Sequence, residues 1–73
     1  MTPQRIRSVY IALEAASTDP AAPADTLSAD FIKLAKQYGA NWAITAEEIR
    51  EVLNMTVAQV HGTWIAIDQE AGR

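Results

Sequence analysis

The sequence predicts an all-α protein, a small four-helix domain that contains a helix-turn-helix unit. Apolar residues recur every three to four positions in four stretches, and residues typical of helix ends stand at the borders of these stretches. No segment shows the alternation of apolar and polar residues that a half-buried strand requires. The 73 residues form one domain, 1–73, near the size at which a single core gives modest stability.

The first helix is expected to begin at Thr2 and Pro3. A threonine hydroxyl caps free backbone N–H groups, and proline at the first helical position lacks an N–H that would have no partner there. Ile11 lies away from the apolar stripe of this helix and leaves a second small apolar surface. The stripe itself, which we expect to be buried, consists of Ile6, Val9, Tyr10, Leu13 and Ala16.

Two prolines in residues 19–24 predict a loop, and Asp25 or Ser28 is expected to cap the second helix. Gly39 stands where a glycine commonly follows a helix. The residues of this helix expected to face the core are Leu27, Phe31, Leu34, Ala35 and Tyr38.

In the connector 40–44, Trp42 and Ile44 are expected to close the core from the side. The connector leads into the predicted helix-turn-helix unit, at about residues 45–69.

This unit carries two capping boxes, in which a threonine hydroxyl and a side chain three residues later satisfy each other's backbone N–H groups. The pairs are Thr45 with Glu48 and Thr56 with Gln59, so helices are predicted over 46–53 and 57–69, the second ending at 72–73. Between them, Asn54 is a residue that tolerates the left-handed conformation of a tight turn. The apolar residues expected to share one core are Ile49, Leu53, Val60 and Trp64.

Residues 48–60 resemble the helix-turn-helix of the promoter-reading region of sigma factors and of LuxR-type regulators. Those families run roughly Glu-Ile-Ala-x-x-Leu-Gly-Ile-Ser-x-x-Thr-Val. The sequence departs from this pattern where Arg50 replaces the small alanine and Asn54 the turn glycine. The matching positions are Glu48, Ile49, Leu53, Met55, Thr56 and Val60.

The resemblance implies binding of DNA, with the helix over 57–69 in the major groove. It places Ala58, Gln59, Gly62 and Thr63 toward the bases, where Gln59 pairs with an adenine edge and Thr63 contacts a thymine methyl or a phosphate. The side chains then expected to contact phosphates are Arg5, Arg7, Lys33, Lys36 and Arg50.

The charge balance favours a different class of function. Nine acidic and six basic residues give a net charge of −3, and residues 57–69 contain no Lys or Arg. DNA-binding proteins usually carry a basic surface, so we expect weak binding of DNA by the monomer. The alternative is an acidic helical module for protein–protein interaction, either an adaptor or a homodimer, that does not bind DNA.

The last helix also carries the residues of a predicted interface. Its apolar arc, residues 57, 60, 64, 65 and 67, is wide enough to imply burial on more than one side. Small residues at four-residue spacing on its other side let a neighbouring helix approach closely. The interface is therefore predicted to involve Ala58, Gly62, Ala66, Trp64 and Ile67.

The composition gives no sign of catalysis or of a cofactor. The chain has no cysteine and a single histidine, His61, which we expect at the edge of the core with a backbone partner. Metal sites need several such ligands, and no glycine-rich phosphate loop is present. We therefore expect no enzyme, no metal and no cofactor. The absence of a long apolar run predicts a cytoplasmic protein without a membrane partner.

Overall fold

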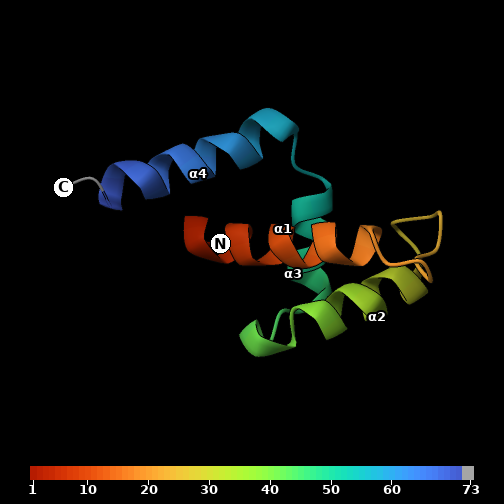
Figure 1. The fold of residues 1–73 in the computed structure, drawn as a ribbon. Coiled ribbons are helices and arrows are strands. Elements are labelled where there is room, and N and C mark those ends of the chain that lie inside the picture. Colours follow the sequence, from red (N-terminus) through yellow and green to blue (C-terminus); the bar gives the residue numbers. More distant parts are fainter. Residues whose placement is uncertain (72–73) are drawn as a thin grey trace.

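The structure of the chain is a computed structural model that describes residues 1–71, and the side chains of residues 1–69. Within this part of the chain all regular structure is helical, so the predicted all-α class with four α-helices is confirmed, whereas the helix-turn-helix unit stays a prediction (Figure 1). The elements are α1 (Pro3–Ser17), α2 (Ala29–Tyr38), the short 3-10 helix η1 (Ala40–Trp42), α3 (Ala46–Leu53) and α4 (Val57–Ala71). The predicted end of the last helix at 72–73 lies outside the described residues.

Helix starts follow the side chains that the sequence offers as caps. The Thr2 hydroxyl accepts a hydrogen bond from the Arg5 N–H at 3.2 Å, and Ser28, rather than Asp25, accepts one from the Phe31 N–H at 3.2 Å. At α3 the predicted capping box of Thr45 is complete. Each bond satisfies an N–H that has no partner within its own helix.

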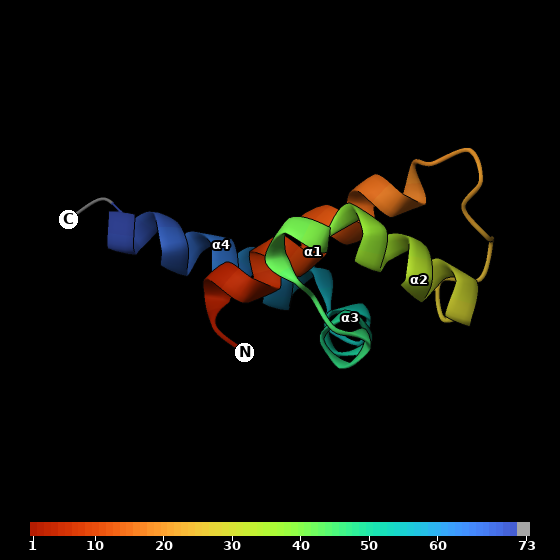
Figure 2. The same cartoon turned by 90° about the horizontal axis from the view of Figure 1, so that it is seen from below.

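α1 lies at the centre of the fold and contacts each of the other three α-helices (Figures 1 and 2). α2 and α3 also pack on each other, which closes a three-helix arrangement around one side of α1. α4 lies across α1 from α2, and its main contacts are with α1.

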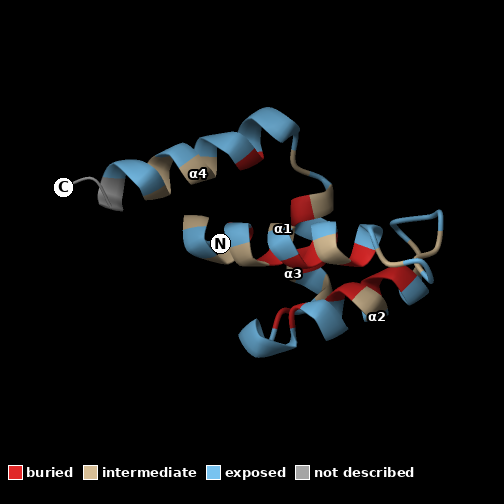
Figure 3. Cartoon of the chain, in the orientation of Figure 1, coloured by how far each residue is buried: buried red, intermediate tan, exposed pale blue. Residues whose placement is uncertain are grey.

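The core fills the space between α1, α2 and α3 (Figure 3). Its largest fully buried side chains are Val9, Phe31 and Ile49, one from each of these helices. Most of α4 is exposed, although Val60 is buried. The core consists of Ile6, Val9, Ala12, Leu13, Ala16, Phe31, Ile32, Ala35, Ile44, Ile49 and Val52.

Three residues expected in the core are exposed, namely Leu27 (66%), Tyr38 (43%) and Trp42 (39%). Leu27 precedes the Ser28 cap and therefore belongs to the loop. Tyr38 turns its hydroxyl outward to donate to the Asp19 carboxylate at 2.5 Å. Ile32, which the sequence analysis did not assign to the core, is buried instead.

The core that α3 and α4 were predicted to share is also less completely buried than expected. Ile49 and Val60 are buried, whereas Leu53 and Trp64 are only half-buried. The cause is the placement of α4, which packs along α1 and not over α3.

Gly39 is required by a close approach and not by a left-handed backbone, since its φ is −97°. A Cβ at this position would lie 2.8 Å from Ile44 Cγ1 and 3.2 Å from Ala12 Cβ. The missing side chain therefore lets Ile44 enter the core. The left-handed residue is Ala43, with φ of 49°, whereas Asn54 has a right-handed φ of −85°.

Replacing Ile49 with alanine is expected to destabilise the fold by about 2–5 kcal/mol, because it leaves a cavity at a fully buried site. Leu53→Ala should lower the free energy of unfolding by a smaller amount, because that side chain is only half-buried. The free energy of unfolding from urea titrations measures both. Ile11→Ala, at an exposed position of α1, serves as the control with little expected change. Unfolding of Ile49→Ala at the same urea concentration as the parent would contradict this core.

Candidate functional site

Arg5 of α1 fixes the start of α3. Its guanidinium donates to both carboxylate oxygens of Glu48, from Nε to Oε2 at 2.5 Å and from Nη2 to Oε1 at 2.9 Å. It also donates to the carbonyl oxygens of Trp42 and Ala43. Such bidentate pairing orients both groups. Arg5, a predicted phosphate contact, is thus already engaged within the fold.

Glu48 belongs both to the ion pair with Arg5 and to the capping box of α3. Its Oε1 also accepts from the Thr45 N–H at 2.9 Å, as the capping box requires. The hydrogen bond from Arg5, with that from the Thr45 backbone, lowers the pKa of Glu48 to about 2. The carboxylate therefore stays ionised where an ordinary glutamate begins to take up a proton.

The start of α4 uses the residues that were expected to read bases. Gln59 Oε1 accepts from the Thr56 N–H at 2.8 Å, and the Gln59 N–H donates to Thr56 Oγ1 at 3.2 Å, which confirms the second capping box. The Thr63 hydroxyl donates to the Val60 carbonyl at 2.6 Å. The side chains of Gln59 and Thr63 therefore both form hydrogen bonds with the backbone of α4 or of its cap.

α4 is held on α1 mainly by apolar contact. The Trp64 and Tyr10 rings meet edge to face, with centroids 5.2 Å apart and planes at 84°. The Trp64 indole N–H is buried and has no acceptor among the described residues. A buried N–H without an acceptor costs about 1–3 kcal/mol, so this contact depends on ring packing and on burial of Val60.

His61 lies on the surface and not at the edge of the core as predicted. Its ring stacks on that of Trp64, with centroids 5.9 Å apart and planes at 22°. The imidazole of His61 thus covers one face of the Trp64 indole. His61 therefore belongs to the exposed side of α4.

The outward face of α4 is apolar and largely exposed in the described part of the chain. We use this term for Val57, Ala58, His61, Gly62 and Ile65, all of which are exposed. Val57 is 70% exposed and Ile65 is 58% exposed. A Cβ built at Gly62 would meet no described atom within 4 Å outside its chain neighbours and the adjacent backbone of α4. The residues from 55 to 67 carry no Asp, Glu, Lys or Arg.

Of the predicted interface residues, the structure leaves Ala58 and Gly62 on this outward face. Ala66 and Ile67 are half-buried, and Trp64 is turned toward α1. The predicted interface residues therefore do not form one exposed surface, because Trp64 packs on α1. The expected burial of the wide apolar arc on more than one side does not occur within the chain.

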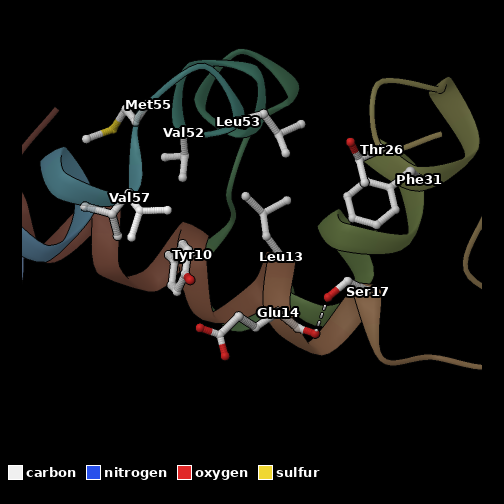
Figure 4. Close-up of a pocket in the computed structure, with 11 residues that line it drawn as sticks. Tyr10, Leu13, Glu14, Ser17, Thr26, Phe31, Val52, Leu53, Met55 and Val57 are labelled. Atoms are coloured by element: carbon white, nitrogen blue, oxygen red, sulfur yellow. Dashed lines mark hydrogen bonds between the residues drawn. The ribbon is translucent and has the colours of Figure 1, made fainter. Parts of the chain in front are cut away.

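An apolar groove of about 280 Å³ runs between α1, the end of α3 and the start of α4 (Figure 4). Leu53, Met55 and Val57 line one side, and Tyr10 and Leu13 of α1 line the other. The groove exists because the turn after α3 carries α4 away from α3 and onto α1.

The predicted phosphate contacts Lys33, Lys36 and Arg50 do come together. They line one hollow between α2 and α3. Gln59 and Thr63 belong to α4, which lies across α1 from α2 (Figure 1). The basic residues and the predicted base-reading residues therefore do not form one continuous surface.

No group of three His, Asp or Glu side chains with metal-binding geometry occurs among the described residues. Every helix described here is too short or too polar to cross a bilayer. Comparisons of the chain with protein-family profiles, curated proteins and solved structures find no match. The resemblance to sigma-factor and LuxR-type units thus stays a prediction from the sequence.

The depressed pKa of Glu48 predicts a specific loss of stability in acid. A group whose pKa is lower in the folded state stabilises the fold above its unfolded pKa of about 4.5, and this contribution is lost as the pH falls toward about 2. The free energy of unfolding, measured by urea titration at several pH values, should therefore decrease across this window.

Glu48→Gln should be less stable than the parent at neutral pH and should lose less stability across the same window. The control is Glu47→Gln, which removes the same charge from the neighbouring exposed residue and leaves Arg5 with its partner. Equal acid sensitivity of Glu48→Gln and the parent would contradict the assigned role of Glu48.

Proposed function

We propose that this chain is a helical protein-interaction module that self-associates through the outward face of α4. The observation that carries the proposal is the exposure of Val57 and Ile65 on either side of Gly62, on a face without formal charge. Exposed apolar surface of this kind favours contact with another protein surface, because burial removes it from water.

The charge distribution directs self-association to this face. Two copies that each carry a charge of −3 repel one another over most of their surfaces. Residues 55–67 carry no Asp, Glu, Lys or Arg, so a contact centred on them brings few like charges together. α4 is thus the element on which a second copy meets the least repulsion.

The small side chains set the geometry of the contact. We place the twofold axis near Gly62 and perpendicular to α4, so that the two α4 helices are antiparallel and both copies use the same surface. The open space at Gly62 lets the two backbones approach closely. In this arrangement Ile65 of each copy packs against Ala58 of the other.

Trp64 supports this surface from behind. Trp64 packs on Tyr10 of α1, and His61 stacks on Trp64, so the outward residues sit on a braced helix. A rigid helix binds with less loss of conformational entropy than a mobile one. We therefore assign Trp64 to the α1–α4 contact and the outward face of α4 to the partner, whereas Ile67 is half-buried and lies outside that face.

Sedimentation equilibrium tests the proposal directly. The parent should reach twice the monomer mass as its concentration increases, and Ile65→Glu should remain a monomer because it places like charges in the contact. Gly62→Leu should also weaken the dimer, although leucine favours a helix over glycine by up to about 1 kcal/mol. Circular dichroism should report an unchanged helical signal in both variants.

The matched control is Leu27→Glu, which introduces the same charge at an exposed apolar residue of the loop before α2. This variant should dimerise like the parent. A parent that stays monomeric at millimolar concentration would rule out self-association through α4. Equal loss of the dimer in Leu27→Glu and Ile65→Glu would show that charge in general, and not α4, decides association.

DNA binding by the helix-turn-helix unit is the second candidate function. It is favoured by the two complete capping boxes, which match the sequence pattern of such units. It is disfavoured because α4 carries no Lys or Arg through residue 69 and because Gln59 and Thr63 bond within α4. Base readout needs donors and acceptors that are free to face the groove.

We expect a random DNA duplex to show weak or no retardation with the parent in a mobility-shift assay at physiological salt. Tight binding that weakens steeply with added salt would instead support the second candidate. In that case Gln59→Ala should relax the preference at one base pair, whereas Arg50→Ala should weaken binding to all sequences alike.

A further inference from the structure

A second surface, away from α4, concentrates positive charge. Lys33 and Lys36 of α2 and Arg50 of α3 line one hollow of about 440 Å³, which we call the α2–α3 hollow. These are three of the five Lys and Arg residues that the structure describes. A chain with a net charge of −3 thus gathers most of its described cations at one place.

No described carboxylate lies within ion-pair distance of these three cations. Among the described side chains the ion pair within 4.0 Å is that of Arg5 with Glu48. Lys33, Lys36 and Arg50 are all exposed, so their charges face solvent at the rim of the hollow. An anionic ligand therefore need not displace an internal partner.

The base of the hollow is apolar. Ala29 and Ile32 of α2 and Ala46 of α3 line it between the basic side chains. Ile32 is almost fully buried, whereas Ala29 is exposed and Ala46 is half-buried. A ligand that fits this surface carries both an apolar group and negative charge.

We infer that the α2–α3 hollow binds an acidic segment of a partner protein. An apolar side chain of the segment covers Ala29, Ile32 and Ala46, and flanking carboxylates face Lys33, Lys36 and Arg50. Charge complementarity of this kind orients a partner and accelerates its association. α4 does not line the hollow, so the inference is independent of self-association through α4.

A short acidic peptide fits this surface better than a nucleic acid does. Three cations neutralise few phosphates, and a phosphate backbone has no apolar group to place on the base of the hollow. The exposed carboxylates of Asp30, Glu47 and Glu51 also lie on α2 and α3 and repel a long polyanion. A short peptide carries fewer negative charges than a duplex and is repelled less.

The test is a nuclear magnetic resonance titration of the full, isotope-labelled chain with acetyl-Asp-Glu-Leu-Phe-Glu-Asp-amide. Amide shifts should concentrate at the residues of the α2–α3 hollow. The combined variant Lys33→Glu, Lys36→Glu and Arg50→Glu should weaken binding about tenfold, because each exposed ion pair contributes modestly. The control Arg7→Glu changes an exposed cation of α1 outside the hollow and should alter binding less than about twofold.

Two further probes separate the alternatives. A peptide with serine in place of leucine and phenylalanine should bind more weakly, and equal binding would overturn the role of the apolar base. A twelve-base-pair DNA duplex should perturb the hollow less than the peptide does, and a stronger effect would make nucleic acid the occupant. Shifts outside the hollow, or none at millimolar peptide, would overturn the inference. The titration of the parent chain is distinguishable from the sedimentation experiment, since it is read at the hollow and no residue of α4 lines the hollow.

Discussion

The packing of three helices on α1 is the constraint on which the rest of the structure depends. Val9, Ala12 and Ala16 of α1 are almost completely buried, and the two alanines let neighbouring helices lie close to its backbone. α2 and α3 share one part of the α1 surface and close the core there. α4 takes another part, around Tyr10, and among the described residues no further element covers its outward face. The exposed apolar surface of α4 thus follows from the arrangement around α1.

One polar contact joins the ends of this arrangement. Arg5 connects the first turn of α1 to Glu48 at the start of α3 and to the end of η1. Because Glu48 also caps α3, the same carboxylate sets both where that helix begins and how it is oriented on α1. The direction in which the chain leaves α3 toward α4 is therefore tied to a contact made at the N-terminal end of the fold.

Local signals in the sequence predicted the helices well, because capping side chains act over three residues. Thr2, Thr45 and Thr56 each cap the helix that the sequence assigned to them. Ser28 was one of two predicted caps, and α2 begins at this later one, which leaves Leu27 in the loop.

Contacts between distant residues had no such signal. Arg5 and Glu48 are 43 positions apart, and nothing near either residue indicates the pair. The use of Gly39 depends on the approach of Ile44, which only the packed structure reveals. The candidate surfaces also depend on how the helices pack. Helical periodicity predicted the apolar arc of α4 but could not show which part of that arc α1 covers. Similarly, the grouping of Lys33, Lys36 and Arg50 required the packing of α2 on α3.

The central claim, that a second copy covers α4, is tested most directly by intermolecular nuclear Overhauser effects in an equal mixture of ¹³C-labelled and unlabelled chains. Ala58 and Ile65 are seven residues apart on one helix, a separation of about 10 Å along the axis at 1.5 Å per residue. A strong effect between their methyl groups must therefore arise between two copies. The account predicts this signal in the isotope-filtered spectrum. An isotope-filtered spectrum of the concentrated sample without it, or with signals from Leu27 and none from α4, would contradict the account.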